Sequence, residues 1–176
     1  LLPHQSRDLQ RVCFDLLTAS GVFKPDEAIE LIKAEIPVTH TSDSILEAQT
    51  LLSNEPKFPH VNDLTKLNTF TIDNEDTIDR DDALSFNPLT DENADQIAIH
   101  IAYAGMLIPA NGPIDQSASH RMSSLYLPDQ RIDMLPEIFS TEIASLDPGK
   151  TRFTLSLTAA VSKSGELLRW NINVSK

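Results

Sequence analysis

The period of the hydrophobic residues changes once along this chain, and the change limits what it can fold into. Up to residue 55, apolar residues recur three and four positions apart, which is typical of one face of a helix. From residue 68 onward they alternate with polar or small residues, which is typical of β-strands. Residues 54–59 contain two prolines and cannot continue a helix. The sequence therefore predicts an α+β fold, with a small helical module and linker over residues 1–58 and a mixed or antiparallel β-sheet with helices over residues 59–176.

Three helices are predicted in the N-terminal module. The first covers residues 5–20, the second begins at Pro25, and the third begins near Ser42 or Ser44. Ser44 and Glu47 have the spacing of a capping box, in which the two side chains satisfy free backbone N–H groups at the start of their own helix.

The second part of the chain is predicted to form a sheet with two helices between its strands. Strands are expected at residues 68–72, 83–86 and 96–103, and in a hairpin that turns at Ser164-Gly165. Asn87-Pro88 and the acidic stretch Asp91-Glu92-Asn93 are predicted to make a turn, and helices are expected at residues 113–124 and shortly before Leu146. The strand at 96–103 has isoleucines on one face and small residues with His100 on the other, so we expect a central strand that is covered on both faces.

Composition and charge exclude some classes of protein. No apolar run approaches the roughly 20 residues of a membrane span, and no signal peptide is visible. The single cysteine, Cys13, lies on an apolar helix face, which favours a core residue over a reactive thiol. The net charge of −12 argues against nucleic acid as a partner, unless a basic surface lies in sequence outside this chain. The chain starts at Leu1 and ends directly after a strand, so we expect a piece of a longer protein.

Acidic residues are concentrated in the segment Thr71–Ser85. Asp73, Asp79, Asp81 and Asp82 fall within ten residues, with Glu75 and Asp76 between them, and strand-like residues stand on both sides. Carboxylates at this density repel one another unless a positive charge lies among them. A hard divalent cation is the natural candidate, because such cations prefer oxygen ligands.

Phosphodiester hydrolysis explains why such a cluster would be useful. The reaction needs its phosphate oxygens neutralised, a water activated and a leaving oxygen stabilised, and one or two magnesium ions can supply all three. Asp73 ends one strand, while Asp79, Asp81 and Asp82 follow a short excursion, so the four can converge. Adjacent Asp81 and Asp82 point apart if the backbone is extended, so each could face a metal ion, or one of them the attacking water.

Other interpretations of the acidic segment remain open. It could be a solvated surface loop, or a calcium- or magnesium-stabilised structural module. An EF-hand loop fits poorly, because Ile78 stands at the sixth position, where that motif requires glycine.

The segment Thr71-Ile72-Asp73 … Asp79-Arg80-Asp81-Asp82-Ala83-Leu84-Ser85 closely resembles the signature of the ribonuclease II / ribonuclease R family, in its catalytic RNB domain. The resemblance continues in the same order for about a hundred residues, through the blocks His100-Ile101-Ala102, Pro113-Ile114-Asp115 to Arg121, Ser124-Leu125-Tyr126-Leu127, Met134-Leu135-Pro136-Glu137, Phe139-Ser140 and Ser145-Leu146.

This resemblance implies a processive exoribonuclease that degrades single-stranded RNA from its 3′ end by Mg²⁺-dependent hydrolysis and releases nucleoside 5′-monophosphates. It assigns Asp73, Asp79, Asp81 and Asp82 to the metal site, with Asp81 the most important for the chemical step. Tyr126 matches a tyrosine that contacts an RNA base, although a core tyrosine is an equal alternative. We expect a cytoplasmic, monomeric parent enzyme with single-stranded RNA as its partner, and neither DNA nor a membrane.

The sequence also departs from the family pattern. Tyr103 stands where the family has an aspartate after the His-Ile-Ala strand. The second half of the RNB domain, with its arginine-rich block, and the OB-type RNA-binding domain are not in this sequence. The N-terminal cold-shock domains are not visible either. We therefore expect the front part of an RNB domain, inactive by itself, and the alternative function is an RNB-like module that binds RNA or protein without cutting.

Overall fold

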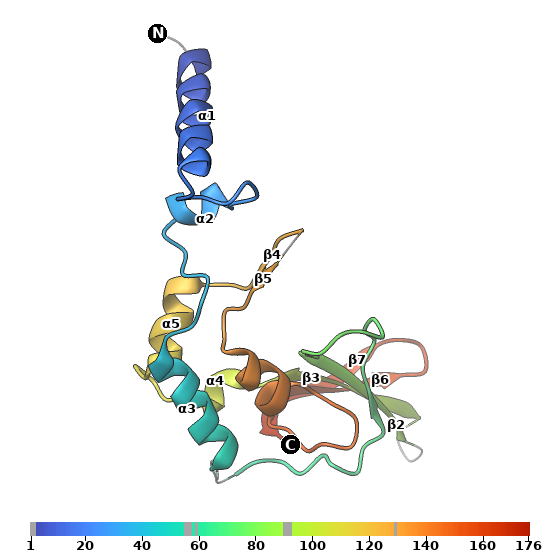
Figure 1. Ribbon diagram of the computed structural model, residues 1–176. Helices are drawn as coiled ribbons and strands as arrows, with labels where there is room; N and C mark the ends of the chain where they lie inside the picture. The colour runs from blue at the N-terminus through green and yellow to red at the C-terminus, as the bar shows by residue number, and fades with distance from the viewer. Residues whose placement is uncertain (1–2, 55–57, 59, 90–92, 129) are drawn as a thin grey trace. The chain divides into compact units, whose positions relative to one another are not determined.

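The structure, a computed structural model, describes residues 3–54, 58, 60–89, 93–128 and 130–176 (Figure 1). It divides into two compact units, Leu1–Val38 and Thr39–Lys176. Most of the linker expected at residues 54–59 lies outside the described residues. The division at residue 58 therefore stays a prediction. No helix in the described part of the chain is long and apolar enough to cross a membrane.

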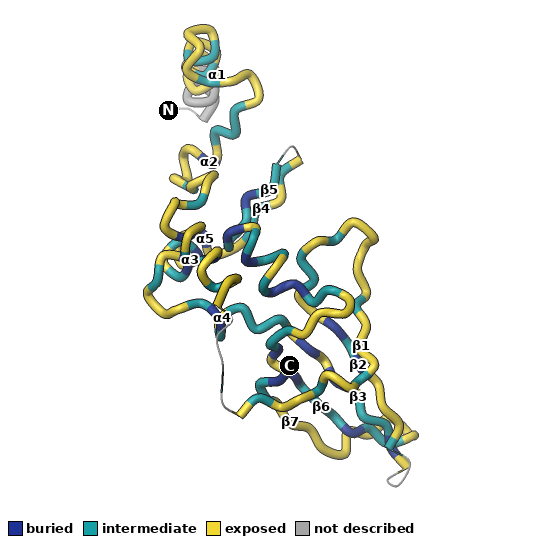
Figure 2. The backbone as a smooth tube through the Cα atoms, turned by 60° about the horizontal axis from the view of Figure 1, so that its bottom comes forward, coloured by how far each residue is buried: buried dark blue, intermediate teal, exposed yellow. Residues whose placement is uncertain are grey.

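The first unit contains two helices, α1 (Pro3–Ala19) and α2 (Ile29–Lys33). The first helix is confirmed, whereas the second begins four residues after the predicted start at Pro25. The apolar stripe of α1 is uncovered in its unit, where Leu9 and Leu16 are 64% and 65% exposed (Figure 2). Cys13 is also exposed, so its interpretation as a core residue is wrong. The helical period identifies an apolar face, but the five residues of α2 provide too little surface to bury it.

The second unit has a helical layer built on α3 (Ser42–Ser53) and α5 (Pro113–Arg121), which lie side by side (Figure 1). A short helix, α4 (Ala104–Leu107), and a π-helical turn, η2 (Phe139–Ala144), complete this layer. Its core consists of five buried residues, with further apolar side chains packed around them: Ala48, Leu107, Ile114, Phe139 and Ala144. The predicted helices near 113–124 and before Leu146 are therefore confirmed, with α5 ending at Arg121.

The start of α3 differs from the predicted capping box. The N-cap is Thr41, whose hydroxyl accepts a hydrogen bond from the Ser44 backbone N–H at 3.2 Å. Glu47 instead turns toward the neighbouring helix, where its carboxylate accepts a hydrogen bond of 2.8 Å from the backbone N–H of Ile114. A carboxylate at that position complements the positive end of the α5 dipole. The tertiary contact with α5 thus replaces the local contact that the sequence spacing suggested.

A five-stranded antiparallel sheet forms the rest of the second unit, in the order β1-β2-β3-β6-β7. Its strands are β1 (Thr69–Phe70), β2 (Asp82–Leu89), β3 (Ala94–Ala102), β6 (Thr154–Ser162) and β7 (Leu167–Ser175). A separate hairpin pairs β4 (Leu125–Tyr126) with β5 (Arg131–Ile132). The predicted turn over Asn87-Pro88 and Asp91-Glu92-Asn93 is wrong at Asn87-Pro88, because β2 runs on to Leu89, and residues 90–92 lie outside the described residues. Pro88 is tolerated there because β1 pairs with β2 only at Leu84 and Ser85, so the missing N–H costs no ladder bond on that side.

The two faces of the sheet differ in burial. Residues paired across antiparallel strands project from the same face. One face carries small and polar side chains that are buried, among them Ala83, Ala98 and His100. The other carries Ile97, Ile99 and Ile101, which are 39–45% exposed in this structure. The central position of β3 is confirmed, but the prediction that both its faces are covered is wrong for the described chain.

A polar network lies on the buried face of the sheet around His100. Its Nε2 atom is 2.9 Å from the Ser85 hydroxyl, and its Nδ1 atom is 2.7 Å from the Ser156 hydroxyl. Thr154 and Ser175 extend the network through further hydroxyl contacts. Burial lowers the pKa of His100 below its usual value. The network therefore joins β2, β3, β6 and β7 through a neutral imidazole.

This environment predicts that acid destabilises the fold through His100. Because the folded-state pKa is depressed, the unfolded chain takes up the extra proton, and stability is lost as the pH falls below about 6.5. One such group contributes at most about 1.4 kcal/mol per pH unit. Urea unfolding between pH 7.5 and 5 should therefore show a smaller loss of stability for His100→Gln than for the wild type. His120→Gln, at an exposed helix position, serves as the control. An unchanged pH profile in His100→Gln would contradict this account.

Candidate functional site

The acid loop, residues 71–81, connects β1 to β2 and is held at its C-terminal end by two distant segments. The backbone N–H of Arg80 donates to the buried Ser145 hydroxyl at 3.1 Å, and the Arg80 carbonyl accepts from the Leu146 N–H at 2.9 Å. The Asp81 carbonyl accepts a 2.7 Å hydrogen bond from the N–H of Ala102, at the end of β3. These bonds extend the sheet ladder through Asp81 and fix where the loop enters β2.

The sheet register separates two of the predicted acids. Asp82 is the first residue of β2 and pairs with Ile101, so it projects from the apolar, exposed face. Asp81 precedes it in an extended backbone, so the two carboxylates leave the chain on opposite sides. Among the described residues, neither Asp81 nor Asp82 takes part in an ion pair.

Asp73 and Asp79, in contrast, are each held by an arginine. Arg80 places its Nε atom 3.9 Å from Asp73 and its Nη1 atom 3.2 Å from Asp147. Arg131 places its Nη1 atom 3.2 Å from Asp79. The side chains of both pairs are only 20–25% exposed, so solvent screens them less than it screens a fully exposed pair.

Arg131 connects the acid loop to the hairpin that carries Tyr126. Arg131 begins β5 and stands directly opposite Tyr126 in β4. The carboxylate of Asp133 fixes the guanidinium from the other side, with oxygens 2.7 Å from Nε and 3.2 Å from Nη2. Tyr126 itself is 72% exposed, which rules out the alternative of a core tyrosine in this structure. The structure thus links Asp79 with the strand pair that presents Tyr126.

Asp81 is the acid with the most perturbed protonation. Reduced hydration of its carboxylate, and then repulsion from Asp79, Asp82 and Asp73, raises the pKa of Asp81. Asp81 is nevertheless an exposed residue, so its carboxylate loses only part of its hydration, to the atoms around it. Asp79, Asp82 and Asp73 therefore lie close enough to Asp81 to repel its negative charge. A neighbouring cation would relieve that repulsion.

The loop carries donor atoms of the kind that a hard cation binds, but in this structure they are not gathered around one point. Carboxylate oxygens are the ligands that Mg²⁺ prefers, and the loop supplies four of them. Within the described residues, however, no three acidic, histidine or cysteine side chains lie close enough together to hold one metal ion. The carboxylates are therefore suitable ligands for a divalent cation, but in this structure two of them, Asp73 and Asp79, pair with arginines.

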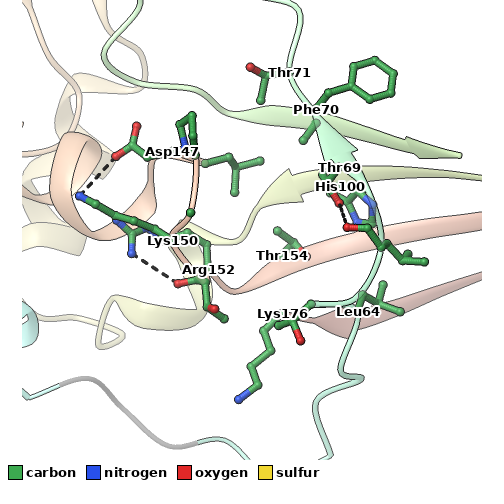
Figure 3. Close-up of a pocket in the computed structure, with 17 residues that line it drawn as sticks. Leu64, Thr69, Phe70, Thr71, His100, Asp147, Lys150, Arg152, Thr154 and Lys176 are labelled. Atoms are coloured by element: carbon green, nitrogen blue, oxygen red, sulfur yellow. Dashed lines mark hydrogen bonds and ion pairs between the residues drawn. The ribbon is translucent and has the colours of Figure 1, made fainter.

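A pocket of about 410 Å³ lies on the His100 side of the sheet, and none of the four acids lines it (Figure 3). Its wall includes Thr71, the first residue of the acid loop, and Ala83, the second residue of β2. Two of the three cationic residues that line it are engaged: Lys150 pairs with Asp147 at 3.6 Å, and the Arg152 guanidinium donates to backbone carbonyls. The pocket therefore adjoins the acid loop through Asp147 without being its binding site.

Sequence reasoning missed the residues that support the acids. Arg80 was visible inside the motif, and its position between two aspartates was a signal that could have been used. Arg131, Asp133, Ser145 and Asp147 lie 50 or more residues away, and only the fold brings them to the loop.

An antiparallel sheet with a helical layer, an acid loop leading into a central strand and an exposed tyrosine beside it define an α+β domain with a carboxylate-rich site. The family model described as "RNB domain" matches residues 61–176. The chain therefore belongs to the RNB domain family, and the resemblance indicated by the acidic motif is confirmed.

Curated relatives agree with this assignment. The chain is 35% identical over 127 residues to "Exoribonuclease 2" of Psychromonas ingrahamii, covering 66% of this chain and 19% of the relative. It is 32% identical over 156 residues to "DIS3-like exonuclease 2" of Xenopus tropicalis, covering 86% and 20%. With "Ribonuclease II, chloroplastic/mitochondrial" of Arabidopsis thaliana it shares 31% over 164 residues, covering 92% and 20%. The chain thus spans about a fifth of the length of these relatives.

Solved structures share the fold. RNase R of Mycoplasma genitalium, in a complex with ribose methylated single-stranded RNA, matches with a TM-score of 0.69 and 23% identity, over 82% of this chain and 23% of that one. Yeast Ssd1, described as a pseudonuclease, matches with a TM-score of 0.60 and 20% identity, over 79% and 16%. These likenesses confirm the α+β fold, and the second shows that the fold alone does not decide between a nuclease and a non-catalytic protein.

Proposed function

We propose that this chain is the front part of an RNB exoribonuclease that hydrolyses single-stranded RNA from its 3′ end to nucleoside 5′-monophosphates with Mg²⁺. The observation that carries the proposal is the retention of all four acids of the motif in one segment, with three of them close enough to Asp81 to repel its negative charge. A protein that only binds RNA would have no need for four mutually repelling carboxylates beside the bound phosphates. This favours the enzyme over the non-catalytic alternative.

In this proposal Asp73, Asp79, Asp81 and Asp82 hold the metal. When bound, Mg²⁺ would neutralise phosphate oxygens and make a water more nucleophilic. The chain's own contribution is to fix the carboxylates: the bonds from Ala102 and Ser145 hold the backbone on either side of the Arg80–Asp81 peptide. Asp81 is proposed to orient the attacking water, because its carboxylate is poorly hydrated and takes part in no ion pair among the described residues.

Tyr126 is proposed to stack on an RNA base. Its ring is exposed on a hairpin that Arg131 ties to the acid loop, so a strand bound at the acids would pass near it. Stacking does not depend on base identity, and that tolerance suits an enzyme that moves along RNA. The net charge of −12 leaves little basic surface for the RNA backbone, so we propose that most of the phosphate contacts come from the rest of the protein.

The remaining parts of the proposal concern the whole protein. We expect the chain by itself to release no mononucleotides from single-stranded RNA, since it spans about a fifth of its relatives. A monomeric parent enzyme, no DNA substrate and a cytoplasmic location stay predictions. The name of the Arabidopsis relative refers to chloroplasts and mitochondria, so family membership does not fix the compartment.

Asp81→Asn in the whole protein tests the assignment of the chemistry. Asparagine keeps the size of the side chain but loses the negative charge, so kcat should fall by at least about a hundredfold, while the Kd for single-stranded RNA should stay within about threefold. Release of labelled mononucleotides from a uniformly labelled RNA measures the first, and fluorescence anisotropy the second. Asp95→Asn, at the far end of the sheet, is the matched control. Undiminished hydrolysis by Asp81→Asn would refute the role given to Asp81.

Tyr126→Ala tests the stacking role. Loss of one stacked base costs about 1–3 kcal/mol, so the Kd for single-stranded RNA in the whole protein should rise by roughly 5- to 150-fold. Tyr126→Phe keeps the ring and should bind RNA with nearly the wild-type affinity. Equal affinities of the alanine variant and the wild type would show that the ring does not contact RNA.

A further inference from the structure

Arg131 contacts Asp79, one of the acids that the proposed function gives to the metal ion, and the inference drawn from this contact rests on that function. Its guanidinium lies between two carboxylates, 3.2 Å from Asp79 and 2.7 Å from Asp133. Arg80 lies more loosely between two acids, with Asp147 hydrogen-bonded at 3.2 Å and Asp73 3.9 Å away. Each arginine therefore binds one acid of the loop together with one acid from outside it.

This arrangement conflicts with a metal ion that gathers the loop acids. No three candidate ligands in the described chain are close enough to share one ion, and two of the four loop acids are bound to arginine. Any set of three drawn from the four must include Asp73 or Asp79. A metal that collects three of these carboxylates must therefore bind at least one that an arginine contacts in this structure.

Arg131 is the more informative of the two arginines because it comes from a different part of the fold. Arg80 belongs to the acid loop, so releasing Asp73 changes only the loop itself. Arg131 belongs to the β4–β5 hairpin and is paired with Tyr126. Its bond to Asp79 is a direct side-chain link between the metal-site acids and the hairpin of the proposed RNA-stacking residue.

We propose that Arg131 is a latch: it competes with the metal ion for Asp79, and its release when metal binds frees the Tyr126 hairpin from the acid loop. The two events are linked thermodynamically, so whatever favours the free hairpin also favours metal binding by the same factor. Asp133 keeps the released guanidinium in place through its own two contacts, so Arg131 stays beside the site.

A different role for Arg131 makes the opposite prediction. A partner that only orients a metal ligand strengthens metal binding, and its loss weakens the affinity by about 10- to 100-fold. A competing cation weakens metal binding, and its loss strengthens the affinity. Because the Asp79 pair is partly exposed, it is worth at most about 1 kcal/mol, which corresponds to about fivefold. The sign of the change therefore distinguishes the two roles.

The test measures Mn²⁺ binding to the 176-residue chain by the EPR signal of the free ion at low ionic strength. Arg131→Gln should bind Mn²⁺ more tightly than the wild type, by up to about fivefold. Lys163→Gln is the matched control, since Lys163 also pairs with an aspartate, Asp95, at 2.6 Å. That pair lies at the other end of the sheet, roughly 20 Å along β2 from Asp82, so its loss should leave the affinity unchanged. Arg131→Met, which keeps the aliphatic stem, replaces the glutamine variant if circular dichroism shows that the latter is unfolded.

Hydrogen exchange of residues 125–132 provides the second measurement. In the wild type, exchange at this hairpin should become faster when Mg²⁺ is added. In Arg131→Gln it should be fast already and should not respond to Mg²⁺. Unchanged or weaker Mn²⁺ binding by Arg131→Gln, with normal binding by the wild type, would overturn the latch and leave the proposed function intact. A failure of all variants to bind Mn²⁺ at millimolar concentration would overturn the metal site, and with it both proposals.

Discussion

Repulsion among four carboxylates within ten residues is the constraint around which this part of the fold is organised. Two arginines, one inside the loop and one from a distant hairpin, offset part of it at Asp73 and Asp79. Asp81 has no such partner among the described residues, and reduced hydration together with repulsion from the other three acids raises the pKa of its carboxyl group. A stable fold alone would not require this concentration of charge, since isolated exposed ion pairs contribute little to stability. The repulsion among the four carboxylates is explained if the loop binds a cation that in turn contacts a phosphate.

The antiparallel sheet supplies the rigidity that such a loop lacks by itself. β3 fixes the end of the loop through the Ala102 N–H, and the register of β2 on β3 sets which face each of the last two acids occupies. On the buried face of the sheet, the network around His100 ties β2, β3 and β6 together with hydroxyl contacts. Positions of catalytic groups that are set by strands vary less than positions set by loops alone.

Much of this could be predicted from the sequence because it depends on local patterns. Alternation predicted the strands and the β6–β7 hairpin, where Gly165 adopts a φ of +87° that other residues rarely accept. The order of the strands confirmed the central place of β3. The acidic motif predicted the family, because its spacing is specific and several collinear blocks follow it. Assignment of Asp73, Asp79, Asp81 and Asp82 to a metal site stays a proposal.

What the sequence could not reveal was set by contacts between distant residues. Glu47 had the right spacing to cap its own helix, yet a contact with α5 took its side chain. The apolar faces of α1 and β3 were recognised, but periodicity does not say whether another element covers a face. Arg131 and Asp133 look like ordinary surface charges in sequence, and only the hairpin geometry brings them to Asp79. The exposure of Tyr126 also depended on this hairpin.

Anomalous diffraction from crystals of the chain soaked in Mn²⁺ tests the central claim most directly, because it locates the ion without relying on activity. The account predicts an anomalous peak within about 2.0–2.2 Å of carboxylate oxygens from at least three of the four loop acids, with the Arg131–Asp79 pair broken. A structure with no peak at the loop, in which Asp73 and Asp79 remain on their arginines at about 10 mM Mn²⁺, would contradict it.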